Sequence, residues 1–168
     1  MVALLKPSDQ AYICLHEAGH AAATYLVGGS VEFIELLPQG STEAGAKART
    51  IRPHGTERTI AVGGFAVEYL LFRQGRLLDE RGTMMTEKGF IDSAMNNSSA
   101  DKISFFGSNL MEADGTWPAA QDREYMNFGV TVVAPQLEPM LDRIQRLAEA
   151  LQAKTRVERA EIESILRS

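Results

Sequence analysis

Apolar residues recur along the chain at helical spacing, and capping or helix-breaking residues mark where the helices end. The clearest pattern covers residues 137–153, where every third or fourth position is apolar and would form one buried face. Residues 9–27 are rich in alanine and apolar residues and lie between Ser8, a capping residue, and the Gly28-Gly29 pair. We predict helices over residues 9–27, 56–72, 91–106, 119–133, 137–153 and 159–166, with a bend at Pro135.

β-Branched and aromatic residues are concentrated in one early segment, residues 31–37, which predicts a strand. The turn residues Pro38-Gln39-Gly40 would end this strand, and we expect a second short strand within residues 49–52. Residues 73–90 are polar and predict an irregular connection. The pattern therefore predicts a mainly α-helical fold with a small β-strand element, in a single domain that spans residues 1–168.

Composition and charge narrow the classes of function. The 168 residues are 45% hydrophobic and 23% charged, which is ordinary for a globular protein. The formal net charge of −5, with no basic cluster, argues against a nucleic-acid binder. No apolar run approaches the ~20 residues of a membrane span, and the N-terminal segment is too short for a signal peptide. A phosphate-binding loop motif is also missing, so we expect neither a membrane span nor an ATPase in this chain.

The pentapeptide His16-Glu17-Ala18-Gly19-His20 has the H-E-x-x-H pattern and lies in the first predicted helix. Histidines four residues apart share one helix face, so both imidazoles can reach one Zn²⁺. The glutamate between them can take a proton from a water bound to that metal. A helix with two solvated histidines is the alternative, but the apolar and small residues around the motif argue against it, because solvated faces usually carry more charge. We predict that His16 and His20 bind Zn²⁺ and that Glu17 is the catalytic base.

Glycines in two of the predicted helices suggest that each of these helices approaches another helix closely. Gly19 and the neighbouring alanines make the first helix slim. Gly63-Gly64 lies inside the helix predicted over residues 56–72, where each glycine costs about 1 kcal/mol relative to alanine. Such a cost usually has a packing reason, which predicts contact with another helix.

Cys14 is the only cysteine, so no internal disulfide can form. This fits a reducing compartment and predicts a cytoplasmic location. Cys14 also lies about 160° from His16 around the predicted helix. We therefore expect a small buried apolar residue at this position rather than a metal ligand.

A catalytic zinc site needs a third protein ligand and keeps one position open for water. The longer motif that supplies a third histidine from the same segment is absent. His54 lies in a Pro-Gly loop and would be solvated, and Glu68 is more typical of a structural carboxylate. Asp92 and Asp101 both lie in the helix predicted over residues 91–106. Ligand chemistry alone does not separate these candidates.

Four stretches, in order, resemble the peptidase domain of the FtsH-type membrane AAA proteases. Residues 16–21 read H-E-A-G-H-A, as in that family, and residues 35–40 are similar to its following strand and turn. Residues 63–72 resemble its G-G-R-x-A-E helix, and residues 147–166 resemble its C-terminal helices. The resemblance covers nearly all of the chain after residue 8 and implies a helical zincin-like peptidase fold with the small β-strand element near the metal site.

The resemblance also implies that the third ligand is an aspartate at a helix start, in a pattern like G-A-S-N-D. Asp92 follows Gly89 and lies at nearly the family's distance from the motif, whereas Asp101 follows Ser98-Ser99 at a longer distance. We predict Asp92 as the third ligand, with Asp101 as the alternative. The family's ATPase module and membrane spans are missing, so the sequence resembles a stand-alone relative. Its expected substrates are peptides or unfolded proteins, with a separate delivery partner as an option, and an oligomeric ring is not indicated.

These observations predict a zinc-dependent metallopeptidase that hydrolyses peptide bonds. Residues 31–37 would bind substrate as an added strand. The alternative is a catalytically degenerate protein that keeps the fold and acts as a metal-binding or partner-binding module. A zinc hydrolase acting on a non-peptide amide is a third option. Intact Glu17 favours catalysis, because a structural zinc site needs no base.

Overall fold

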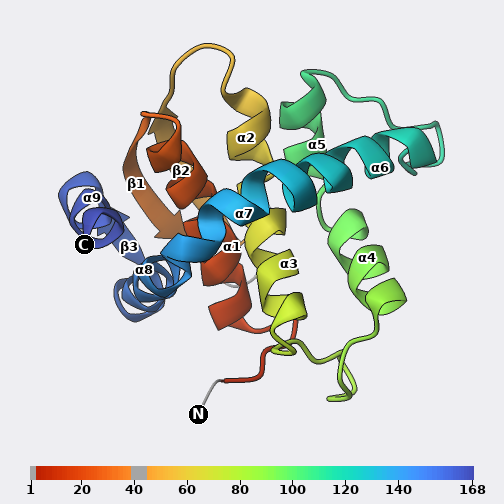
Figure 1. Ribbon diagram of the computed structural model, residues 1–168, viewed down its shortest axis with the longest axis horizontal. Coiled ribbons are helices and arrows are strands. Elements are labelled where there is room, and N and C mark those ends of the chain that lie inside the picture. The colour runs from red at the N-terminus through yellow and green to blue at the C-terminus, as the bar shows by residue number, and fades with distance from the viewer. Residues whose placement is uncertain (1–2, 39–44) are drawn as a thin grey trace.

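The computed structural model describes residues 3–38 and 45–168, and it is mainly α-helical with one small sheet (Figure 1). The Gln39-Gly40 part of the predicted turn lies outside the described residues. The elements in chain order are α1 (Gln10–Leu26), β1 (Ser30–Leu36), β2 (Ala46–Ile51), α2 (Glu57–Ala61), α3 (Gly63–Arg73), α4 (Glu87–Asn96), α5 (Ser99–Phe106), α6 (Ala119–Phe128), the π-helical turn η1 (Gly129–Val133), α7 (Ala134–Leu137), the 3₁₀ turn η2 (Glu138–Met140), α8 (Leu141–Lys154), β3 (Arg156–Glu158) and α9 (Arg159–Arg167). The predicted mainly α-helical fold with a small β-strand element is confirmed.

Two predicted helices are each divided in the structure. The helix predicted over residues 56–72 is α2 followed by α3, with Val62 between them. The helix predicted over residues 91–106 is α4 followed by α5, and α4 begins earlier, where the Thr86 hydroxyl accepts a hydrogen bond from the Gly89 amide. The second division occurs at Asn97 and Ser98, because asparagine and serine are poor helix-interior residues.

The sheet is antiparallel with the strand order β2-β1-β3. Ile34 of β1 lies opposite Ala48 of β2 on one side and Val157 of β3 on the other. Both edges of β1 are therefore paired, and the prediction that residues 31–37 bind substrate as an added strand is wrong. Sequence reasoning placed a strand here but missed β3, whose three residues are too few to show a pattern.

Helix α1 lies at the centre of the molecule, between the sheet with α9 on one side and α4 with α5 on the other (Figure 1). It packs against α3 and α8. The predicted apolar face of the C-terminal helical region is buried throughout, at Leu137, Met140, Leu141, Ile144, Leu147, Ala148 and Leu151. This face covers one side of α1 and leaves the histidine side free for other elements.

Helices α1 and α3 touch at their backbones, so the helix that each was predicted to approach closely is the other one. A Cβ atom placed on Gly19 would lie 2.5 Å from the Gly63 carbonyl oxygen, and one placed on Gly63 would lie 2.7 Å from the Gly19 carbonyl oxygen. Real Cβ atoms do not approach backbone oxygens this closely, so neither position admits a side chain without moving a helix.

We expect Gly19→Ala to lower the free energy of unfolding by about 1–3 kcal/mol, because the added methyl overpacks a backbone contact. Chemical denaturation followed by circular dichroism measures the effect. Gly89→Ala is the matched control: it also adds a methyl to a helical glycine, but the nearest atom is the Thr86 hydroxyl at 3.1 Å. A Gly19→Ala protein as stable as the control would show that α1 and α3 are free to separate.

Candidate metal centre

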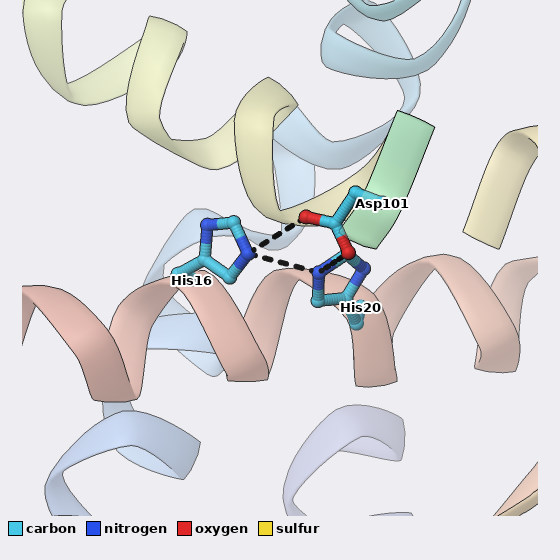
Figure 2. A group of neighbouring side chains, drawn as sticks. All are labelled: His16, His20 and Asp101. Atoms are coloured by element: carbon cyan, nitrogen blue, oxygen red, sulfur yellow. Dashed lines mark hydrogen bonds and ion pairs between the residues drawn. The ribbon is translucent and has the colours of Figure 1, made fainter. Parts of the chain in front are cut away.

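Three side chains from two helices converge beside the centre of α1 (Figure 2). The Nε2 atoms of His16 and His20 are 3.0 Å apart. Asp101, in the first turn of α5, places Oδ2 3.1 Å from Nε2 of His16 and Oδ1 3.4 Å from Nε2 of His20. A tetrahedral zinc with bonds of about 2.0–2.1 Å holds its ligand atoms about 3.3 Å apart. The three side chains therefore have the donor types and the spacing of a zinc site.

Each imidazole is held in its orientation by a hydrogen bond at Nδ1, the ring nitrogen that does not face Asp101. Nδ1 of His16 donates to the Glu68 carboxylate over 2.6 Å, and Nδ1 of His20 donates to the Ile60 carbonyl oxygen over 2.7 Å. A carboxylate and a carbonyl can only accept, so these bonds keep a proton on each Nδ1 and turn each Nε2 toward Asp101. Glu68 is thus placed as an orienting carboxylate rather than a ligand, and burial and its charge raise the pKa of Tyr12 beside it.

A close contact with α3 also restricts the ring of His16. A Cβ atom on Gly64 would lie 2.4–2.6 Å from three atoms of this ring. Only glycine leaves room for the imidazole here, so the Gly63-Gly64 pair serves two contacts: Gly63 meets the α1 backbone, and Gly64 meets the first histidine.

The structure does not bring Asp92, the predicted third ligand, to the histidines. Its side chain is 57% exposed on α4 and pairs with Lys88. Asp101, the predicted alternative, lies beside the histidines instead. The helix ends before Asn97 and Ser98, and a new helix that carries Asp101 begins after them. The sequence contained a signal for a helix start before Asp101. The serine pair that precedes Asp101 is as typical of a helix start as the glycine that precedes Asp92.

The other sequence candidates lie away from the cluster. His54 is exposed in the segment before α2, and Cys14 is fully buried. Among the described residues, His16, His20 and Asp101 form the group of side chains spaced to hold a metal ion.

Glu17 lies beside the cluster and faces a cavity of about 300 Å³. Glu17 and the first histidine of the motif both line this cavity, so the carboxylate and the imidazole border the same space. The lining combines two carboxylates, an imidazole, a phenol and an amide with apolar groups, from Pro7, Tyr12, Ile13, His16, Glu17, Gly45, Glu68 and Asn97.

The charges of the cluster are balanced by protons in the metal-free state. Burial by itself lowers the pKa of His16, but the Glu68 and Asp101 carboxylates outweigh it and raise this pKa well above 6.5. Burial likewise opposes charge on His20, and Asp101 again raises its pKa. Burial by itself raises the pKa of Asp101, but the two histidines hold it well below its usual value. The cluster therefore favours positive charge between its donor atoms.

We expect the metal-free protein to lose stability as the pH rises above 6.5. A histidine whose pKa is raised by folding stabilises the protein fully below its unfolded value of 6.5, and this contribution is lost as the pH rises through the folded value. For Asp101, with its lowered pKa, the contribution is present above 3.8 and is lost only as the pH falls through the folded value.

Thermal unfolding of chelator-treated protein between pH 6.5 and about 9 measures this loss. Asp101→Asn should flatten the slope, because it removes a carboxylate that raises both histidine pKa values. An equal slope in wild type and Asp101→Asn would contradict the assignment of these charges.

Comparison with known proteins relates this chain to a protein family. Within residues 3–38 and 45–168, no helix combines the length and apolar character needed to cross a membrane. No curated protein matches the chain. The model of the Peptidase M50B-like family matches residues 1–84, which is half of the chain and includes the two histidines, Glu17 and Glu68 but not Asp101. This match identifies a metallopeptidase-type domain, and the closer resemblance to FtsH-type peptidases stays a prediction. The chain belongs to the Peptidase M50B-like family.

Proposed function

We propose that this protein is a zinc-dependent peptidase in which His16, His20 and Asp101 bind Zn²⁺ and Glu17 is the general base. The observation that carries the proposal is the pair of Nε2 atoms 3.0 Å apart. Both Nδ1 atoms donate to acceptors, so neutral imidazoles would point two lone pairs at each other and at the Asp101 carboxylate. Such an arrangement needs a proton or a metal ion beside the nitrogens, and two imidazoles with one carboxylate are a typical set of ligands for catalytic zinc.

When bound, zinc supplies Lewis acidity, which lowers the pKa of a water molecule and polarises a peptide carbonyl. Glu17 follows His16 on α1 and faces the same cavity. Its carboxylate accepts the proton of the attacking water and then delivers it to the nitrogen of the leaving amine. Glu68 and the Ile60 carbonyl hold the imidazoles in orientation through these steps.

The cavity beside Glu17 is the proposed substrate site. Its volume of about 300 Å³ suits one side chain or a short extended segment rather than a folded domain. Peptides and unfolded protein segments are therefore the proposed substrates, and a delivery partner would be needed only for folded ones. The ordered motifs shared with FtsH-type peptidase domains support a kinship with them, which is part of the same proposal.

The metal site is tested by elemental analysis of protein purified without chelator. We expect about one zinc per wild-type chain and its loss in Asp101→Ala, because two histidines alone make an incomplete site. Asp92→Ala is the matched control, since it removes an exposed aspartate of the neighbouring helix and should keep the metal. Retention of zinc by Asp101→Ala, or its loss from Asp92→Ala, would reject Asp101 as the third ligand.

The general base is tested by Glu17→Gln, with cleavage of casein and quenched fluorescent peptides as the assay. We expect the rate to fall at least about a hundredfold while the zinc content is unchanged, because only the proton transfer is removed. Glu87→Gln, at an exposed position of α4, controls for the loss of a carboxylate and should keep full activity. A fully active Glu17→Gln protein would overturn this mechanism, and a zinc-loaded wild type without peptidase activity would leave a binding module as the better reading.

A further inference from the structure

Lys102 follows Asp101 in the chain and is 1% exposed. Its ammonium group donates to the Asp122 carboxylate over 2.6 Å and to the Met95 carbonyl oxygen over 2.8 Å. It also lies 5.0 Å from the centre of the Trp117 ring. Burying a charged amine strongly destabilises a protein unless the amine is paired and hydrogen-bonded. These three contacts offset that cost only while α5 stays in its place.

The contacts of Lys102 connect α5 to the elements on either side of it. Met95 belongs to the last turn of α4, and Asp122 belongs to the first turn of α6. Trp117, in the segment before α6, adds a hydrogen bond from its indole N–H to the Ser99 hydroxyl at the start of α5. The first turn of α5 is thereby held from two sides.

Helix α5 depends on such contacts because it is short and lacks a side-chain cap at its N-terminus. It has 8 residues, and its N-cap residue, Ser98, directs its hydroxyl back to the Ala94 carbonyl oxygen instead of capping the helix. Isolated helices of this length are not stable in water. The position of α5 is therefore decided by tertiary contacts, and Lys102 makes the most buried polar ones.

Within the described residues, the Asp101 carboxylate forms a hydrogen bond with His16 and an ion pair with His20, and it has no further side-chain or backbone partner there. Ligand carboxylates are usually held by a further hydrogen bond that fixes their orientation. Here the direction of the carboxylate depends on the backbone of α5, so whatever holds this backbone also positions the ligand.

We propose that Lys102 is a positioning residue for the metal site: it ties the first turn of α5 to α4 and α6 and so keeps Asp101 aligned with His16 and His20. The inference rests on the proposed zinc site. It adds a connection from that site to Asp122 and Trp117, which lie outside the residues matched by the family.

The test measures the zinc affinity of Lys102→Met by competition with a chromogenic chelator. Methionine keeps the apolar stem and removes the charged anchor. We expect zinc affinity to fall about 10–100-fold, the usual effect of losing a group that supports a ligand. Lys88→Met is the matched control, because it breaks an exposed lysine–aspartate pair on α4 and should leave the affinity unchanged. Asp122→Asn weakens the anchor from α6 and should give a smaller loss, and it carries the test if Lys102→Met does not fold.

A thermodynamic cycle separates positioning from general destabilisation. On an Asp101→Asn background, Lys102→Met should not lower the weak residual zinc affinity of the two histidines any further, because the ligand that Lys102 positions is gone. A Lys102→Met protein that unfolds at a lower temperature but binds zinc like wild type would overturn the inference. An equal loss of affinity on both backgrounds would overturn it as well. Absence of zinc binding in wild type would instead reject the proposed function, and these outcomes are distinct.

Discussion

The backbone contact between α1 and α3 is the constraint on which the metal centre depends. At this crossing, Gly19 and Gly63 leave no room for side chains, and Gly64 leaves just enough for the ring of His16. Because the two helices are so close, the Glu68 carboxylate on α3 reaches Nδ1 of His16 directly. A wider crossing would separate these atoms and leave the imidazole free to rotate. The glycines have low helix propensity, but they allow the close helix contact that fixes the orientation of the His16 ring.

Charge interactions within the cluster add to the effect of this packing. Three partly buried groups, His16, His20 and Asp101, influence one another's charge: Glu68 and Asp101 favour the charged form of His16, Asp101 favours that of His20, and both histidines keep Asp101 ionised. The cluster holds protons when no metal is bound, and a metal ion would replace them. Metal binding is therefore expected to be linked to proton release, as at other sites built from histidine and carboxylate ligands.

The two helices that supply ligands are stabilised in different ways. Helix α1 has 17 residues and lies between α3 and α8, so its two histidines are held by the core. Helix α5 has 8 residues, and its position depends on Lys102 and the elements that this side chain contacts. The third ligand is consequently the part of the site most sensitive to changes at a distance from the metal.

The H-E-x-x-H pattern by itself determined two donors and the glutamate between them, because residues four apart on one helix necessarily share a face. Gly19 and the Gly63-Gly64 pair likewise predicted close helix contacts, because glycines within a predicted helix usually have a packing reason. Local pattern also predicted helix ends near glycine and proline and the buried face of α8, because these features depend on residues close together in the chain.

Only the tertiary structure decided which aspartate joins the histidines. Asp92 and Asp101 both follow residues typical of a helix start, and their distances from the motif in sequence do not determine their distances in space. The break at Asn97 and Ser98 and the buried Lys102–Asp122 pair turn Asp101 inward, while Asp92 faces solvent on α4. The pairing of both edges of β1 was decided in the same way, by segments far apart in the chain. Local patterns report on neighbours within a few residues, whereas a site built from two helices depends on how those helices pack.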